Sequence, residues 1–240
     1  PGSLVTFLVW EDGAAGRTGL GQVSEIALAV PPGSIGEWLQ RAMAARIPVE
    51  GPSREFGETV LRLKDPDGII VKLVGVDLPA AAPLPDPIAP TRIRGVTVLT
   101  DDPQATSDFA ARFGYRPDRT EVNTHRMVSD TDVVDVRDAR GYFPGVPGAS
   151  IIDHVAFRAA DADAVRQMRL SLRDVDSATN VHDRKYFLSL YVREPGGTLF
   201  EYATDAPGVT VDETLEHLGE TLMVPPREAS RTEEDRKSVV

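Results

Sequence analysis

Cysteine is absent from this sequence of 240 residues, which excludes disulfides, thiolate metal sites and cysteine nucleophiles. No apolar run reaches the roughly 18 residues that a membrane-spanning helix needs, so we expect no membrane partner. Positive charge is also scarce, because 26 Lys and Arg stand against 37 Asp and Glu, a formal net charge of -11. Nucleic acid is therefore not expected as a partner, since proteins bind it through basic patches. Together these absences predict a cytoplasmic protein.

The remaining composition is that of an ordinary globular protein, with 41% hydrophobic and 26% charged residues. Hydrophobic periodicity predicts strands and helices in three successive groups. These are strands at 23–30, 54–63 and 68–76 with a helix at 34–45, then a strand at 93–100 and a helix at 102–113 capped by Asp102, then a strand at 151–159 and a helix at 162–172. Five prolines within 79–90 predict an extended connector between the first two groups.

The first and last groups are copies of each other, and their spacing can be checked. Pro66 and Pro195 lie 129 positions apart, as do Gly68 and Gly197. The strand at 93–100 lies between these copies, so one repeat is about 60–70 residues long. Each repeat then comprises one strand, a helix and further strands.

The same spacing aligns Glu25 with His154 and Lys72 with Glu201, so only the last copy has both a histidine and a glutamate. A residue that the shared fold required would be retained in both copies. The pair His154 and Glu201 therefore favours a functional role over an architectural one.

His154 and Glu201 both lie in runs with the alternation of a strand. In DHVAF the histidine falls on the face opposite Val155 and Phe157, and in LFEYA the glutamate falls opposite its aromatic neighbours. An imidazole and a carboxylate on one concave sheet face suit a divalent metal, and a second histidine would complete the ligand set typical of non-haem Fe(II) oxygenases. Spacing alone leaves a buried hydrogen bond between the two side chains open as the alternative.

Two motifs carry a resemblance to a known family, namely IIDHVAF at 151–157 and YFLSLYVREPGGTLFEYATDAPG at 186–208. They resemble the vicinal oxygen chelate superfamily of glyoxalase I, bleomycin-resistance proteins and extradiol dioxygenases, and within it the hydroquinone-type ring-cleaving dioxygenases. The resemblance implies an α+β fold of tandem βαβββ modules, with curved mixed sheets and helices on their outer face. It also implies Fe(II) or Mn(II), a small aromatic substrate and O2.

The resemblance further implies roles for individual residues. His154 and Glu201 match metal ligands, and Arg184 and Tyr191 match residues that contact the substrate. Its place before Asp183 and Arg184 puts His182 at the mouth of the pocket, with a solvated loop histidine as the alternative. A three-residue turn at 195–197 would place Tyr191 across from Glu201, whereas a four-residue turn would point it to the other face. Without the resemblance, Tyr191 is best interpreted as a core aromatic and Arg184 as a solvated charge at a strand end.

The family's members have four modules, and its pattern predicts how this chain divides. The expected segments are a remnant of a first module at 1–20, a second module at 21–78, a Pro-rich linker at 79–92, a third module at 93–148, a fourth at 149–208, and a C-terminal helix with a polar tail at 209–240. The run LVTFLVW at 4–10 matches the last strand of the first module. The strand that carries the first histidine ligand in the family is then missing, so metal is expected to be weakly bound or absent in this chain.

Two hypotheses about function follow. The first is a metal-dependent ring-cleaving dioxygenase acting on a hydroquinone or catechol-like aromatic. The second is a metal-free protein of the same fold that binds or sequesters a small molecule. Glyoxalase-type isomerisation is less favoured, because its additional ligands are not found. A homodimer is expected, with the charged tail from residue 225 onward as an arm over the partner subunit.

Overall fold

The computed structural model describes residues 3–8, 12–80, 84, 86–221 and 223. Strand, helix and three strands follow one another three times, which confirms the predicted tandem βαβββ modules. The elements are β1 (Gln22–Val30), α1 (Ile35–Ala44), β2 (Val49–Glu55), β3 (Glu58–Lys64) and β4 (Ile70–Gly75); β5 (Arg92–Thr100), α2 (Pro103–Ala111), β6 (Arg116–Glu121), β7 (Thr124–Val128) and β8 (Val133–Asp138); then β9 (Val155–Ala159), α3 (Ala162–Ser171), β10 (His182–Asp183), β11 (Phe187–Arg193) and β12 (Leu199–Pro207).

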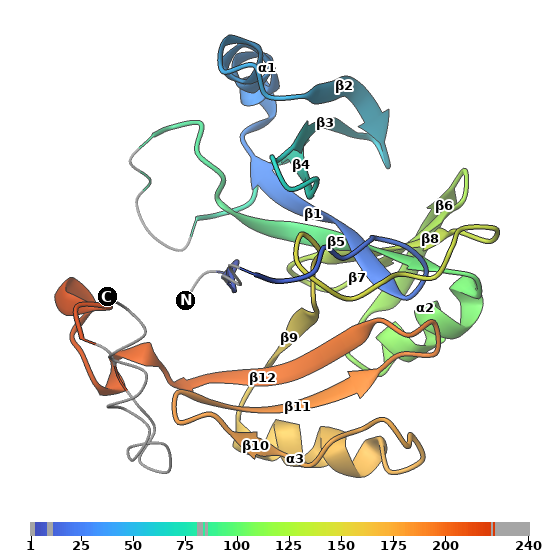
Figure 1. The fold of residues 1–240 in the computed structure, drawn as a ribbon, viewed down its shortest axis with the longest axis vertical. Helices are drawn as coiled ribbons and strands as arrows, with labels where there is room; N and C mark the ends of the chain where they lie inside the picture. Colours follow the sequence, from blue (N-terminus) through green and yellow to red (C-terminus); the bar gives the residue numbers. More distant parts are fainter. Residues whose placement is uncertain (1–2, 9–11, 81–83, 85, 222, 224–240) are drawn as a thin grey trace. The chain divides into compact units, whose positions relative to one another are not determined.

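The chain folds into two compact units, Pro1–Val155 with Arg193–Phe200, and Ala156–Val192 with Glu201–Val240. In the first unit, an eight-stranded sheet has the order β2-β3-β4-β1-β5-β8-β7-β6. Its centre is the antiparallel pair β1 and β5, drawn in blue and green in Figure 1. Each of these strands also pairs in parallel with the last strand of its own module, β4 or β8. The sheet therefore joins two similar halves along one seam.

The core of the first half lies between α1 and the sheet. Val30, Ile35, Leu61 and Leu73 are buried together there, and Trp38 of α1 packs against them. The burial of β1 alternates residue by residue, as expected for a strand with two different faces. The helix forms where apolar side chains recur at helical spacing, so the sequence directs its apolar face to the sheet.

The second half is covered by α2, whose first turn is capped as predicted. The Asp102 carboxylate accepts a hydrogen bond of 3.0 Å from the Ala105 N–H. Phe109 and Phe113 continue this segment and contact Phe200, with ring centroids 6.1 Å and 5.5 Å from that of Phe200. The aromatic cluster thus binds the start of β12 to the helix side of the first unit.

The four remaining strands of the described residues form a second sheet, of order β10-β11-β12-β9. In β9, which begins directly after His154, Phe157 and Ala159 are buried while Ala156 and Arg158 are exposed, so the predicted alternation holds for the residues within the strand. α3 buries Val165 and Met168 and is capped at its N-terminus by Asp161.

The two turns that define the repeat are built alike. The Gly68 N–H donates to the Asp65 carbonyl at 3.1 Å, and the Gly197 N–H donates to the Glu194 carbonyl at 2.8 Å. Both glycines have positive φ angles, 97° and 104°, which glycine adopts without steric cost. The spacing between the turns in the sequence therefore corresponds to an equivalent position in two modules.

Three predictions of secondary structure are wrong. Residues 54–63 are not one strand, because β2 and β3 meet in a tight turn at Phe56, which has a positive φ of 51°. In the predicted first strand at 4–10, residues 4–8 form no strand, and residues 9 and 10 lie outside the description. The predicted C-terminal helix is represented in the described residues by two short 3-10 turns, Val209–Val211 and Leu215–His217, and residues 224–240 of the tail are not described.

None of the helices in the described ranges has the length and hydropathy needed to span a bilayer.

Candidate active site

Tyr191 on β11 and Glu201 on β12 face each other across the hairpin. The turn between the strands has three residues, because the Glu194 N–H donates to the Thr198 carbonyl at 3.0 Å. Counting from this closing pair places Tyr191 directly opposite Glu201. The Tyr191 hydroxyl hydrogen-bonds with the Glu201 carboxylate. The structure therefore confirms the register that the three-residue turn predicts.

The Tyr191–Glu201 pair holds a proton in a buried position. Glu201 is only 5% exposed. Burial, followed by the hydrogen bond and the charge of Glu201, raises the pKa of the Tyr191 phenol above its usual value of 10. The phenol thus remains protonated at neutral pH and donates to the carboxylate.

Arg184 and His182 approach the same tyrosine. The Arg184 guanidinium carbon lies 5.6 Å from the centroid of the Tyr191 ring, and its hydrogen bond to Tyr191 opposes the rise in the phenol's pKa. The His182 ring lies 6.1 Å from the same ring. The second unit therefore brings together four of the residues singled out in the sequence, namely His182, Arg184, Tyr191 and Glu201.

The backbone of Tyr191 is fixed by a residue that sequence reasoning missed. Thr179 accepts a hydrogen bond of 3.0 Å on its hydroxyl from the Tyr191 N–H. Its own N–H donates to the Tyr191 carbonyl at 2.9 Å. Thr179 lies in a loop outside the strand pattern, so no periodic signal could have identified it.

His154 is oriented by its neighbour in the sequence. Its Nδ1 lies 2.8 Å from the Asp153 carboxylate. A carboxylate that accepts this hydrogen bond leaves the proton on Nδ1, so a neutral imidazole would have its lone pair on Nε2. Carboxylates commonly orient metal-binding histidines in this way. The DH pair in the sequence could have revealed Asp153.

A metal centre of the proposed type needs three protein ligands. His154 belongs to the first unit and Glu201 to the second. In the part of the chain that the structure describes, no three His, Asp or Glu side chains are grouped as metal ligands. Since protein metal sites of this type use three protein ligands, the described residues do not fit a complete centre.

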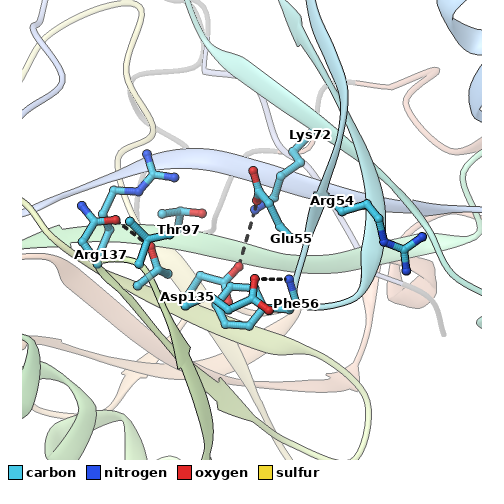
Figure 2. A pocket seen from close by; sticks show the side chains of 11 residues that line it. Arg54, Glu55, Phe56, Lys72, Thr97, Asp135 and Arg137 are labelled. Atoms are coloured by element: carbon cyan, nitrogen blue, oxygen red, sulfur yellow. Dashed lines mark hydrogen bonds and ion pairs between the residues drawn. The ribbon is translucent and has the colours of Figure 1, made fainter.

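The first unit contains a cavity of about 220 Å³, which Figure 2 shows with its lining side chains. The Lys72 ammonium lies 3.4 Å from Glu55 and 3.5 Å from Asp135. Glu121 accepts a hydrogen bond from the Phe56 N–H. These charged side chains of the cavity are thus engaged with other groups of the protein.

Lys72 also pairs with Glu25, at 3.4 Å, on the inner face of the sheet. Burial would raise the pKa of Glu25, but the Arg62 hydrogen bond and the charges of Lys72, Arg62 and Arg137 hold it below its usual value. Lys72 and Glu25 occupy the positions that the repeat aligns with Glu201 and His154. One module thus has a buried ion pair at these two positions, where the other has a histidine and a glutamate.

Comparison with known proteins identifies the family. "Putative ring-cleaving dioxygenase MhqE" of Bacillus subtilis is 32% identical over 233 residues, covering 94% of this chain and 77% of that protein. "Putative ring-cleaving dioxygenase MhqO" of the same organism is 33% identical over 235 residues, covering 94% and 75%. This chain belongs to the ring-cleaving dioxygenases of the vicinal oxygen chelate superfamily.

Other proteins similar to this chain are consistent with that family. A chlorohydroquinone/hydroquinone 1,2-dioxygenase of Sphingobium indicum is 29% identical over 245 residues, covering 95% of the chain and 76% of that protein. The crystal structure of a dioxygenase from Bacillus subtilis, titled "putative", matches 98% of the chain and 79% of its own, with a TM-score of 0.89 and 30% identity. Glyoxalase I of Zea mays shares the fold, with a TM-score of 0.54 and 15% identity over 80% of the chain and 69% of its own. No family model matches the sequence.

Replacing Lys72 with Met should destabilise the first unit by about 3–5 kcal/mol, because it leaves buried carboxylates without their cation. The measurement is the free energy of unfolding from urea denaturation. Lys64→Met is the matched control, since Lys64 is exposed on β3 and should change stability by about 0.5 kcal/mol or less. Equal effects of the two substitutions would contradict a buried ion network.

Tyr191→Phe should lower the free energy of unfolding by about 1–3 kcal/mol in the metal-free protein, because the buried Glu201 carboxylate loses a hydrogen-bond donor. Tyr142→Phe serves as the control, since Tyr142 is 56% exposed. A double-mutant cycle with Glu201→Gln should show coupling between the two sites. Strict additivity would argue against a hydrogen bond between them.

Proposed function

We propose that this chain is a metal-dependent, extradiol-type dioxygenase that cleaves the ring of a hydroquinone or catechol-like aromatic with O2. The observation that carries the proposal is the buried Tyr191–Glu201 hydrogen bond with Arg184 beside it. It occurs in a chain that is about a third identical to ring-cleaving dioxygenases. The name of the Sphingobium relative supports a hydroquinone as the substrate class.

The proposal gives Tyr191 and Arg184 separate roles toward the substrate. Tyr191 carries a proton that it can donate to an oxygen of the ring or of the reacting O2, and the Glu201 contact orients its hydroxyl. Arg184 is exposed and permanently charged, so it can attract the aromatic hydroxyl as an anion and offset the negative charge that develops on it. His182 lies close enough to contribute to the wall of the pocket.

The proposal assigns His154 and Glu201 as ligands of Fe(II) or Mn(II). Their chemistry supports the assignment, since an oriented neutral imidazole and a carboxylate are both suitable donors. The described residues do not complete the centre, so no step of the reaction is derived through the metal. The proposal also includes a homodimer and a cytoplasmic location, which sedimentation and cell fractionation would test.

O2 uptake tests the function directly. The gene product expressed from its own start codon, reconstituted anaerobically with Fe(II) or Mn(II), should consume O2 with hydroquinone, a chlorinated hydroquinone or catechol. His154→Ala and Glu201→Gln should reduce both the uptake and the bound metal, whereas His125→Ala, which changes a histidine on β7, should affect neither. Tyr191→Phe should lower kcat by about 10²–10⁴-fold while metal remains bound.

Absence of O2 uptake with every dihydroxybenzene, in protein that has bound metal, would contradict the proposal. Tight binding of an aromatic that survives both chelation and His154→Ala would instead favour the metal-free binding function. Metal analysis and calorimetric titration of the same samples distinguish these results.

A further inference from the structure

Glu194 is a buried carboxylate that the proposed reaction does not use. It begins the turn between β11 and β12 and is 2% exposed. One oxygen accepts a hydrogen bond of 2.8 Å from the Thr198 N–H. The other accepts bonds of 2.7 Å from the Gly196 N–H and from the Thr106 hydroxyl. The Glu194 backbone also hydrogen-bonds with Thr198 and Gly197. Glu194 therefore forms hydrogen bonds with three successive residues, Gly196, Gly197 and Thr198.

The Thr106 hydroxyl links this carboxylate to α2 and to the end of β5. Thr106 and Thr100 are both fully buried, with their hydroxyl oxygens 3.0 Å apart. A carboxylate only accepts, so the single proton of Thr106 goes to Glu194 and Thr106 accepts from Thr100. A directed chain of hydrogen bonds therefore runs from Thr100 through Thr106 to Glu194.

The turn has no space for a side chain at position 196, which is a glycine. A Cβ atom added to Gly196 would lie 2.6 Å from the Thr100 hydroxyl oxygen and 2.8 Å from a Glu194 carboxylate oxygen. A side chain at position 196 would therefore displace the Thr100 or the Glu194 side chain. The glycine is thus matched to the carboxylate and hydroxyl that surround it.

We propose that Glu194 is a positioning residue whose carboxylate, anchored by Thr106, holds the three-residue turn and so keeps Tyr191 opposite Glu201. The inference rests on the proposed function, since it concerns residues assigned to that site. Two consecutive glycines give the turn access to other conformations. A one-residue slip would move every following side chain to the opposite face of the sheet, and Tyr191 would leave Glu201.

Because the chain has no cysteine, an introduced pair can report the register. The Glu194–Thr198 pair closes the turn by hydrogen bonding, so Arg193 and Leu199 form the next, non-hydrogen-bonded pair. Residues in such pairs have Cα atoms about 4.5 Å apart, within the range that a disulfide accepts. Arg193→Cys with Leu199→Cys should therefore form a disulfide readily in the native register and poorly in a slipped one.

The measurement is the equilibrium constant of this disulfide against glutathione in folded, metal-free protein. Adding Glu194→Gln should lower it by about tenfold to a hundredfold. Glutamine places an amide donor against the N–H of Gly196 or of Thr198, whichever way its side chain is turned. A general loss of stability would not change the constant while both redox forms remain folded, which circular dichroism verifies.

Thr106 provides a graded series that disturbs the turn less. Thr106→Ser keeps the hydroxyl and should leave the disulfide constant unchanged. Thr106→Val removes one of the hydrogen bonds to Glu194 and should give an intermediate decrease. An equal effect of both substitutions, or a constant that Glu194→Gln leaves unchanged, would overturn the proposal.

Activity provides a second, reversible test. Reduced Glu194→Gln protein with the cysteine pair should lose dioxygenase activity to about the level of Tyr191→Phe, and adding Tyr191→Phe to it should cost little more. Oxidation locks the native register and should restore kcat, while the same pair with Glu194 intact should be active in both redox forms. If oxidation does not restore activity, the proposal that Glu194 positions Tyr191 is contradicted. If the parent protein consumes no O2, the disulfide constant still tests the role of Glu194.

Discussion

The register of the β11–β12 hairpin decides whether the site can exist. Side chains alternate between the two faces of a strand, so a shift of one residue separates Tyr191 from Glu201 completely rather than slightly. The three-residue turn, closed by the Glu194–Thr198 hydrogen bond, gives the one arrangement in which the phenol reaches the carboxylate. Arg184 and His182, which contact the Tyr191 ring, depend on the same register.

Two equivalent positions of the repeat, 25 and 72 in the earlier module and 154 and 201 in the last, carry different pairs of side chains. In the earlier module, Lys72 and Glu25 form a buried ion pair, and further arginines neutralise the surrounding carboxylates. A network of this kind pairs the buried charges of the sheet with one another. Removal of one partner would leave the opposite charge buried without a counter-charge. In the last module, His154 and Glu201 have no such lysine at the aligned position. The two proposed metal ligands of the last module thus occupy the positions that a buried ion pair fills in the earlier module.

The sequence predicted what depends on local pattern. The repeat was visible because Gly68 and Gly197 are needed for the same turn, and Asp102 was recognisable as a cap from its place before a helical pattern. The turn at Phe56 was missed because its positive φ is adopted by a residue that is not a usual turn former. Leucine spacing predicts a C-terminal helix, but the described residues form only short turns there, because spacing alone does not supply the packing that stabilises a helix.

The candidate site was predictable only where it depends on local sequence pattern. Tyr191 and Glu201 lie in one hairpin, so strand alternation and turn length were enough to bring them together. The roles of Thr179, Thr106 and Glu194 depend on contacts between segments far apart in the chain, which no local pattern encodes.

Division into two units gives these distant contacts their importance. The turn Arg193–Phe200 belongs to the unit that contains α2, whereas Tyr191 and Glu201 belong to the other. The first unit holds the turn through Thr106 and through the aromatic contacts of Phe200. The turn that sets the register of the hairpin is therefore held by contacts within the first unit. Rigid support of this kind allows a proton donor and a buried carboxylate to face each other without relying on the flexible pair of glycines between them.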